Sequence, residues 1–302
     1  MVNSGGIFCE RMSLYTGAGK GFLFLSMIFH CFSFRGDCWM DPLDIADSAW
    51  VSTIIDAIRE GRIFLAVQGV HSVTDVDRLL YGECLARLLN RDGTVTSARE
   101  FIPILDIWGK TPLLDQHMIK LVLDELDADP RAVLGCNIST DGLTDAEWSL
   151  IYRQLVERAH LAHRLVLEIT ETRPLGDIVT TNRCLAAARK LGCLVAVDDF
   201  GSGQVTPWQL LRLEVDIVKI DAAFVRDIKE SHPRGNSLQF MIGLAKCAAP
   251  TVIVEGVETN THLIDAVMAG ATHAQGYHLS RPVFLHSNEP VFQANSEGKT
   301  CH

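Results

Sequence analysis

Short apolar runs alternate with longer amphipathic ones between about residue 50 and residue 285. This alternation is typical of strands interleaved with helices, and it restricts the chain to the α/β folds. The expected strands are 63–67, a stretch that ends near Glu83, 133–138, 165–170, 194–198, 217–220, 251–254 and a short one near Gln275. The expected helices are 113–126, 148–159, 178–191, 238–247 and 261–269. Eight strands with helical crossovers in roughly 230 residues favour a TIM-type (β/α)8 barrel over an open doubly wound sheet.

One domain is expected over residues 50–285, because no linker rich in Pro, Gly or Ser divides them. Residues 1–49 read as a leader without a clear fold, and 286–302 as a polar tail. The apolar run at 21–33 is shorter than the roughly 20 residues that span a bilayer, so we expect no membrane anchor. A signal peptide or anchor is the alternative. A start assigned too early, with Met40 as the true first residue, is a further interpretation.

Charge and cysteine usage narrow the class of protein. The 302 residues carry a formal net charge of -10, which argues against a partner made of macromolecular nucleic acid, because phosphate binding needs clustered Lys and Arg. The nine cysteines are an odd number with no CxxC pair. This pattern indicates reduced thiols and a cytoplasmic protein rather than a disulfide framework or a zinc site.

Acidic side chains gather where the expected strands end. Asp198 and Asp199 directly follow the apolar run 194–197, and two adjacent carboxylates are costly to bury unless cations neutralise them. Polar residues at or near the other strand ends are Glu83, Asn137, Glu168, Lys219, Asp221, Glu255 and Gln275. A barrel builds its active site at the carboxyl ends of its strands, and oxygen ligands without histidine or thiolate select Mg²⁺ or Mn²⁺. Two such ions suit the hydrolysis of a phosphodiester.

Eight segments in this order resemble one known family. They are 81–87 (YGECLAR), 101–103 (FIP), Asn137, 167–171 (LEITE), 198–203 (DDFGSG), 216–221 (DIVKID), 255–259 (EGVET) and 275–277 (QGY). The chain resembles an EAL domain, the cyclic-di-GMP-specific phosphodiesterase family, from about residue 54 to 285. The resemblance implies a TIM-type barrel whose first strand is antiparallel, with two Mg²⁺ or Mn²⁺ ions.

The resemblance also implies a role for each matching residue. Glu83, Asn137, Glu168 and Asp198 would bind one metal, and Asp198 with Asp199 would help to hold the second. Lys219 would orient the attacking water or balance charge, and Glu255 would be the general base or the partner of a metal-bound water. Arg87 would bind a phosphate of the substrate, and Gln275 would support the site by a hydrogen bond. Asp221 and Glu258 would hold the ligands and Lys219 in place. Glu171 would brace the loop after the aspartates, the alternative being a helix cap.

The chain departs from the family pattern at four places, which include Gly69 and Val70 where the family usually has Pro and Ile, and His278 where an apolar residue is usual. Cys84 replaces the middle alanine of the family's name-giving motif, and 202–207 (SGQVTP) stands where the family commonly reads TGYSSL. Pro207 lacks a backbone donor and has a fixed φ, so we expect this loop to differ in shape from the corresponding loop of the family. The resemblance implies a homodimer formed near this loop.

The expected function is hydrolysis of cyclic di-GMP to linear pGpG. The alternatives are a catalytically silent module that binds cyclic di-GMP or docks a protein, and an unrelated metal-dependent barrel. An unrelated metal-dependent barrel would explain the carboxylates but not the order of the motifs.

Overall fold

The computed structural model describes residues 42–170, 175–229 and 235–285. Glu171, most of the leader and the whole polar tail therefore lie outside the described residues. The helix α1 begins at Pro42, earlier than the expected domain start at residue 50. Among the helices that the structure describes, none combines the length and the apolar character needed to cross a bilayer.

Eight strands of the described chain close into a barrel. They are β1 (Ile63–Ser72), β2 (Leu79–Leu89), β4 (Leu134–Ser139), β5 (Leu165–Thr170), β6 (Leu194–Phe200), β7 (Ile217–Ile220), β8 (Thr251–Val254) and β9 (His273–Ala274). From β2 through to β9, neighbours in this ring are parallel, and β9 pairs back to β1. Strand β1 is antiparallel to both of its neighbours, which confirms the expected barrel with an antiparallel first strand. Two short strands, β3 (Val95–Ser97) and β10 (Val283–Phe284), extend the sheet.

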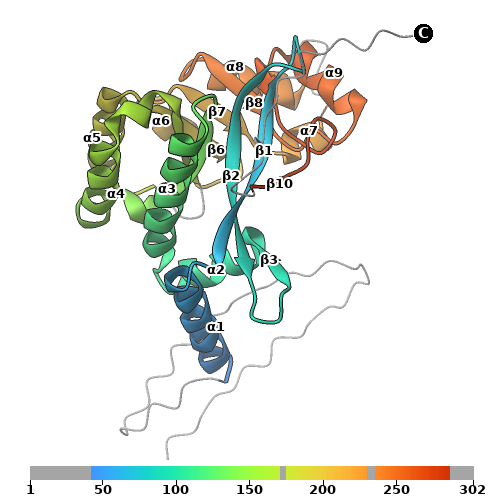
Figure 1. Ribbon diagram of the computed structural model, residues 1–302. Helices are drawn as coiled ribbons and strands as arrows, with labels where there is room; N and C mark the ends of the chain where they lie inside the picture. Colours follow the sequence, from blue (N-terminus) through green and yellow to red (C-terminus); the bar gives the residue numbers. More distant parts are fainter. Residues whose placement is uncertain (1–41, 171–174, 230–234, 286–302) are drawn as a thin grey trace, which may run out of the picture. The chain divides into compact units, whose positions relative to one another are not determined.

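The first strand pair differs from the expectation in two respects. Strands β1 and β2 form a long antiparallel ladder with no helix between them (Figure 1), because antiparallel strands need no crossover. The expectation that Glu83 follows its strand is wrong, since Glu83 lies in the middle of β2, opposite Gln68 of β1. Strand β2 continues to Leu89 because its second half also pairs with β3.

Helices cover the outside of the ring. They are α1 (Pro42–Arg59), α2 (Ala98–Ile107), α3 (Thr111–Ala128), α4 (Asp145–Glu157), α5 (Ile178–Leu191), α6 (Pro207–Leu210), α7 (Ala223–Arg226), α8 (Ser237–Ala245) and α9 (Asn260–Ala269), with 3₁₀ turns at Thr140–Leu143 and Ala159–Arg164. Helices α3, α4 and α5 lie together beside the central strands (Figure 1). The helices and the outward residues of the strands share one continuous apolar core.

Inside the barrel, an apolar layer lies next to the charged side chains of the polar cluster. Its buried members are Val70, Tyr81, Val166, Ala196, Ile217 and Ile253. Successive side chains of a strand alternate between its faces, so the residue two positions later points to the same interior. For the five layer residues from Tyr81 onward, those later residues are Glu83, Glu168, Asp198, Lys219 and Glu255. The layer is therefore the floor on which the polar site rests.

The unusual loop after the aspartates ends in a regular helix start. Thr206 caps α6, and Gln209 donates its backbone N–H to the Thr206 hydroxyl at 3.2 Å. Pro207 is the first residue of that helix, where its missing N–H costs nothing and its fixed φ is helical. Pro207 thus fits the local structure instead of distorting it.

Candidate active site

Lys219 lies at the centre of the polar cluster inside the barrel. Its side chain is fully buried, and its Nζ lies 2.6 Å from Asp198 Oδ1, 2.8 Å from Glu168 Oε2, 3.0 Å from Glu255 Oε1 and 3.2 Å from Glu83 Oε2. Four strands or strand ends supply the four carboxylates. One ammonium cannot balance four carboxylates, so the cluster has room for further positive charge.

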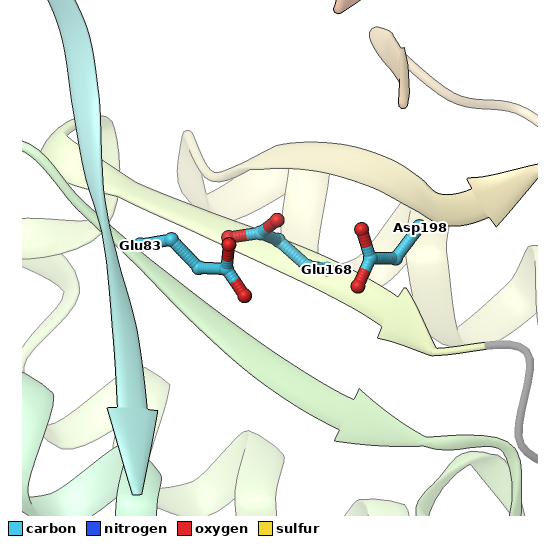
Figure 2. A group of neighbouring side chains, drawn as sticks. All are labelled: Glu83, Glu168 and Asp198. Atoms are coloured by element: carbon cyan, nitrogen blue, oxygen red, sulfur yellow. The ribbon is translucent and has the colours of Figure 1, made fainter. Parts of the chain in front are cut away.

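Amide side chains fix Glu83 from two sides. Asn137 Nδ2 donates to Glu83 Oε1 at 2.9 Å, and Gln275 Nε2 donates to Glu83 Oε2 at 2.6 Å. Figure 2 shows the Glu83, Glu168 and Asp198 side chains reaching toward one another from β2, β5 and β6. The structure therefore brings together residues that stand 192 positions apart in the chain.

A bulge lets two consecutive aspartates serve one site. Neighbouring residues of a regular strand point to opposite faces, but the β6–β7 register shifts between Val197 and Phe200. Asp199 has φ 50°, the one positive φ of a non-glycine residue in the described ranges. With this backbone, Asp198 and Asp199 both reach Glu255, and one ligand atom from each of the three carboxylates lies within 4.8 Å of the others.

Burial and charge set the protonation of the cluster. Burial raises the pKa of Glu168 to about 8 and that of Asp198 to about 7, against the opposing charge of Lys219. It also raises the pKa of Glu255 well above its ordinary value. For Glu83, burial is outweighed by Lys219 and the hydrogen bonds from Asn137 and Gln275, which lower its pKa. Burial alone would lower the pKa of Lys219, but the carboxylates raise it well above its ordinary value.

The residues present fit divalent cations. Glu83, Glu168 and Asp198 form one group of carboxylates with ligand atoms within 4.8 Å of one another, and Asp198, Asp199 and Glu255 form a second. Asp198 belongs to both groups. Glu168 Oε1 and Asn137 Oδ1 are buried with no hydrogen-bond partner among the described residues. Buried oxygens without partners beside excess negative charge suit a hard cation such as Mg²⁺ or Mn²⁺.

A groove of about 400 Å³ opens above the second carboxylate group. Asp199 and Glu255 line it together with Arg99, Asp221, Gln275, Glu258 and Tyr277, among others. Asp221 accepts the backbone N–H of Ala223, and Glu258 accepts from Arg226 at 2.7 Å. Neither carboxylate forms an ion pair with Lys219 in the described part of the chain.

Arg87 lies next to this groove without being among its lining residues. Its Nη1 donates to the carbonyl of Ala86 at 2.9 Å, and Tyr277 and Glu83 are near enough to act on its charge. Arg99, on the first turn of α2, lines the groove and forms no ion pair with any described residue. The structure thus offers a second guanidinium that the sequence motifs do not indicate.

A separate apolar pocket of about 180 Å³ adjoins the first carboxylate group. Leu85, Ile102 and Met118 are among its walls, and Asn137 links it to the carboxylate cluster through its hydrogen bond to Glu83. Asp115 of α3 lines it, is buried, and accepts the hydroxyl and the backbone N–H of Ser139 at 2.6 and 3.1 Å. Sequence reasoning missed Asp115, because a single acid inside an amphipathic helix carries no distinguishing pattern.

Tyr81 is a further residue that motif reasoning left without a role. It lies two residues before Glu83 on β2, and its hydroxyl donates to Glu168 Oε2 at 3.1 Å. Burial raises the pKa of this phenol well above its ordinary value, so it stays a donor at neutral pH. The two-residue spacing from Glu83 is the sequence signal that points it into the same interior.

The sequence comparisons decide the family. The family model described as the EAL domain matches residues 52–282. The chain belongs to the EAL domain family. This EAL domain is 26% identical over 245 residues to the cyclic di-GMP phosphodiesterase PdeF of Escherichia coli K12, a match that covers 78% of the chain and 32% of PdeF. It is 30% identical over 215 residues to the cyclic di-GMP phosphodiesterase PA2567 of Pseudomonas aeruginosa, covering 67% of the chain and 35% of that protein.

The EAL domain chain spans about a third of the length of these curated relatives. Among solved structures it resembles the FimX EAL domain of Xanthomonas citri in complex with c-diGMP, with a TM-score of 0.68 and 20% identity. That match covers 82% of this chain and 98% of the FimX chain. At such identity the likeness shows the fold, which agrees with the barrel described above.

Proposed function

We propose that this protein hydrolyses cyclic di-GMP to linear pGpG with two Mg²⁺ or Mn²⁺ ions. The observation that carries the proposal is the pair of carboxylate groups that share Asp198 beneath an open groove. The names of the curated relatives support cyclic di-GMP as the substrate. Two such cations, when bound, supply Lewis-acid activation of water and neutralise charge on the phosphoryl group.

The chain's own residues divide the remaining work. Glu83, Asn137, Glu168 and Asp198 would hold one ion, and Asp198, Asp199 and Glu255 would surround the other. Lys219 balances part of the negative charge in a place that solvent does not reach. Glu255 lines the groove, where its carboxylate is placed to accept a proton from the attacking water. Arg87 and Arg99 are the guanidinium groups that can meet the second phosphate.

The apolar pocket beside Asn137 supports a nucleotide substrate. A purine buries its faces against apolar side chains, and the edge of guanine carries adjacent N–H donors. The Asp115 carboxyl group lies in this pocket and matches such donors. We therefore place one guanine base of the substrate there, with its phosphate toward the metal cluster.

The alternative is a catalytically silent EAL module that binds cyclic di-GMP or docks a protein. Its support is the altered loop from Ser202 to Pro207, together with Trp208 and Leu211, which are 61% and 51% exposed beside that loop. The same exposed face is where we expect a homodimer to form. Because every carboxylate of the two groups is present, hydrolysis is the better supported function.

Substitution of Glu83 tests the site assignment. With full-length protein and Mn²⁺, Glu83→Ala should lower kcat/KM for cyclic di-GMP by at least about a hundredfold, because it removes a metal ligand. Glu157→Ala, on the exposed side of α4, is the matched control and should keep wild-type turnover. A fully active Glu83→Ala variant would show that the site is assigned wrongly. Tight binding of cyclic di-GMP by the wild type without any turnover would favour the silent module.

A further inference from the structure

The Tyr81 hydroxyl is a polar group in an otherwise apolar layer. The Tyr81 side chain is 2% exposed and packs in the barrel floor with Val166, Ala196 and Ile217. A buried phenol needs a hydrogen-bond partner, and Glu168 Oε2, at 3.1 Å, is the partner in the structure. Phenylalanine would fill the same apolar space without the cost of burying a hydroxyl, so the hydroxyl calls for an explanation beyond packing.

Gly135 of β4 provides the room for this contact. A Cβ atom at this position would overlap Glu168 Oε1 and would lie 2.6 Å from Tyr81 Cε2. Gly135 is not one of the glycines with positive φ, so its backbone conformation does not require glycine. The residue is needed for space alone. Tyr81, Gly135 and Glu168 therefore form one interlocking unit across β2, β4 and β5.

The contact distinguishes the two oxygens of Glu168. Oε2 receives the Tyr81 hydroxyl at 3.1 Å and the Lys219 ammonium at 2.8 Å. Oε1 is buried and has no hydrogen-bond partner in the part of the chain that the structure describes. A carboxylate held at one oxygen from two directions keeps its orientation, and its other oxygen is left for a cation.

We propose that Tyr81 is a positioning residue that holds Glu168 Oε2, so that Glu168 binds a divalent cation through Oε1. The inference rests on the cation site of the proposed function, and it assigns Tyr81 to one of the two carboxylate groups. Glu168 belongs to the group with Glu83 and Asp198 and not to the group with Asp199 and Glu255. Loss of the hydroxyl should therefore weaken one cation site and spare the other.

Calorimetric titration of full-length protein with Mn²⁺ at pH 8, without nucleotide, tests this inference. In Tyr81→Phe, one of the two binding steps should weaken by about tenfold, the loss typical of removing a partner of a metal ligand. The second step should keep its wild-type Kd. Tyr152→Phe is the matched control, because Tyr152 stacks on Trp148 in α4 outside the cluster, and it should bind Mn²⁺ like the wild type.

Two results would overturn the inference. Unchanged Mn²⁺ affinity in Tyr81→Phe would mean that the hydroxyl does not position Glu168. Equal weakening of both binding steps would mean that it acts through the fold as a whole. A wild-type protein that binds Mn²⁺ in two steps but leaves cyclic di-GMP intact would contradict the proposed hydrolysis alone, whereas a wild type that binds no Mn²⁺ would contradict both.

Discussion

At the scale of single residues, the site depends on the backbone of Asp199. A non-glycine residue in the left-handed region costs roughly 1–2 kcal/mol, and Asn and Asp tolerate it better than most. Asp199 has this conformation at the bulge of β6, where the carboxylates of Asp198 and Asp199 face the same site. Strained backbone is common at active sites, so this conformation supports the proposed role of Asp199.

Substitutions of Asp199 separate its backbone role from its charge. Asp199→Asn keeps a residue that tolerates positive φ but removes a carboxylate of the second group, so kcat/KM should fall by at least about a hundredfold while the unfolding temperature stays near wild type. Asp199→Ala should lose activity and also about 1 kcal/mol of stability. Steady-state kinetics and denaturant unfolding measure both effects. Wild-type activity in Asp199→Asn would exclude this carboxylate from the site.

Lys219 is the second residue on which the cluster depends. Removing one partner of a buried ion pair typically costs about 3–5 kcal/mol, because the other charge is left uncompensated. Lys219→Met should therefore lower the unfolding temperature of the metal-free protein strongly. Mn²⁺ should raise the unfolding temperature of the variant more than that of the wild type, since the cation then replaces the missing charge. Equal thermal shifts in the two proteins would argue against a shared role of lysine and metal.

At the scale of elements, one buried acid joins helix α3 to strand β4. Asp115 is 6% exposed and accepts both hydrogen bonds from Ser139, which fixes the helix against the strand that carries Asn137. Burial raises the pKa of Asp115 to about 7, against the hydrogen bonds from Ser139. The helix and the strand are therefore held by a group whose ionisation opposes folding.

This shift predicts how stability depends on pH. The folded protein keeps the Asp115 proton up to about pH 7, whereas the unfolded chain releases it near the ordinary pKa of 3.8. The contribution of Asp115 to the free energy of unfolding is therefore full below pH 3.8 and is lost as the pH rises through 7. The loss amounts to about 4 kcal/mol if nothing else relaxes. Asp115→Asn, which cannot ionise, should gain stability relative to the wild type between pH 5 and pH 8. A stability difference that does not change with pH would contradict this account.

At the scale of the whole molecule, local sequence patterns predicted where the helices and strands lie better than they predicted which strands pair and in which direction. The expected bounds 165–170, 217–220 and 251–254 agree with β5, β7 and β8, because each is a short buried run with clear ends. The expected helix 178–191 agrees with α5, which Asp177 caps at the start and the left-handed Gly192 at the end. These signals lie within a few residues of one another, so a sequence displays them directly.

The arrangement of strands depends on contacts that local patterns do not contain. An apolar run does not show whether its neighbour is parallel, and the direction of β1 was expected only from the family resemblance. The stagger of the barrel strands likewise determines that Tyr81 reaches Glu168 and that Lys219 meets four carboxylates. The motifs identified most residues of the polar cluster, Lys219 included, whereas the central position of Lys219 and the apolar floor required the three-dimensional structure.

Product analysis on the full-length protein tests the central claim most directly. Purified protein is incubated with cyclic di-GMP and Mn²⁺, and the nucleotides are separated by chromatography over time. The account predicts complete conversion to linear pGpG, no conversion after the divalent ions are chelated, and recovery when Mn²⁺ or Mg²⁺ is restored. Cyclic di-GMP that stays intact in the presence of Mn²⁺, while the protein is folded and binds the nucleotide, would contradict it.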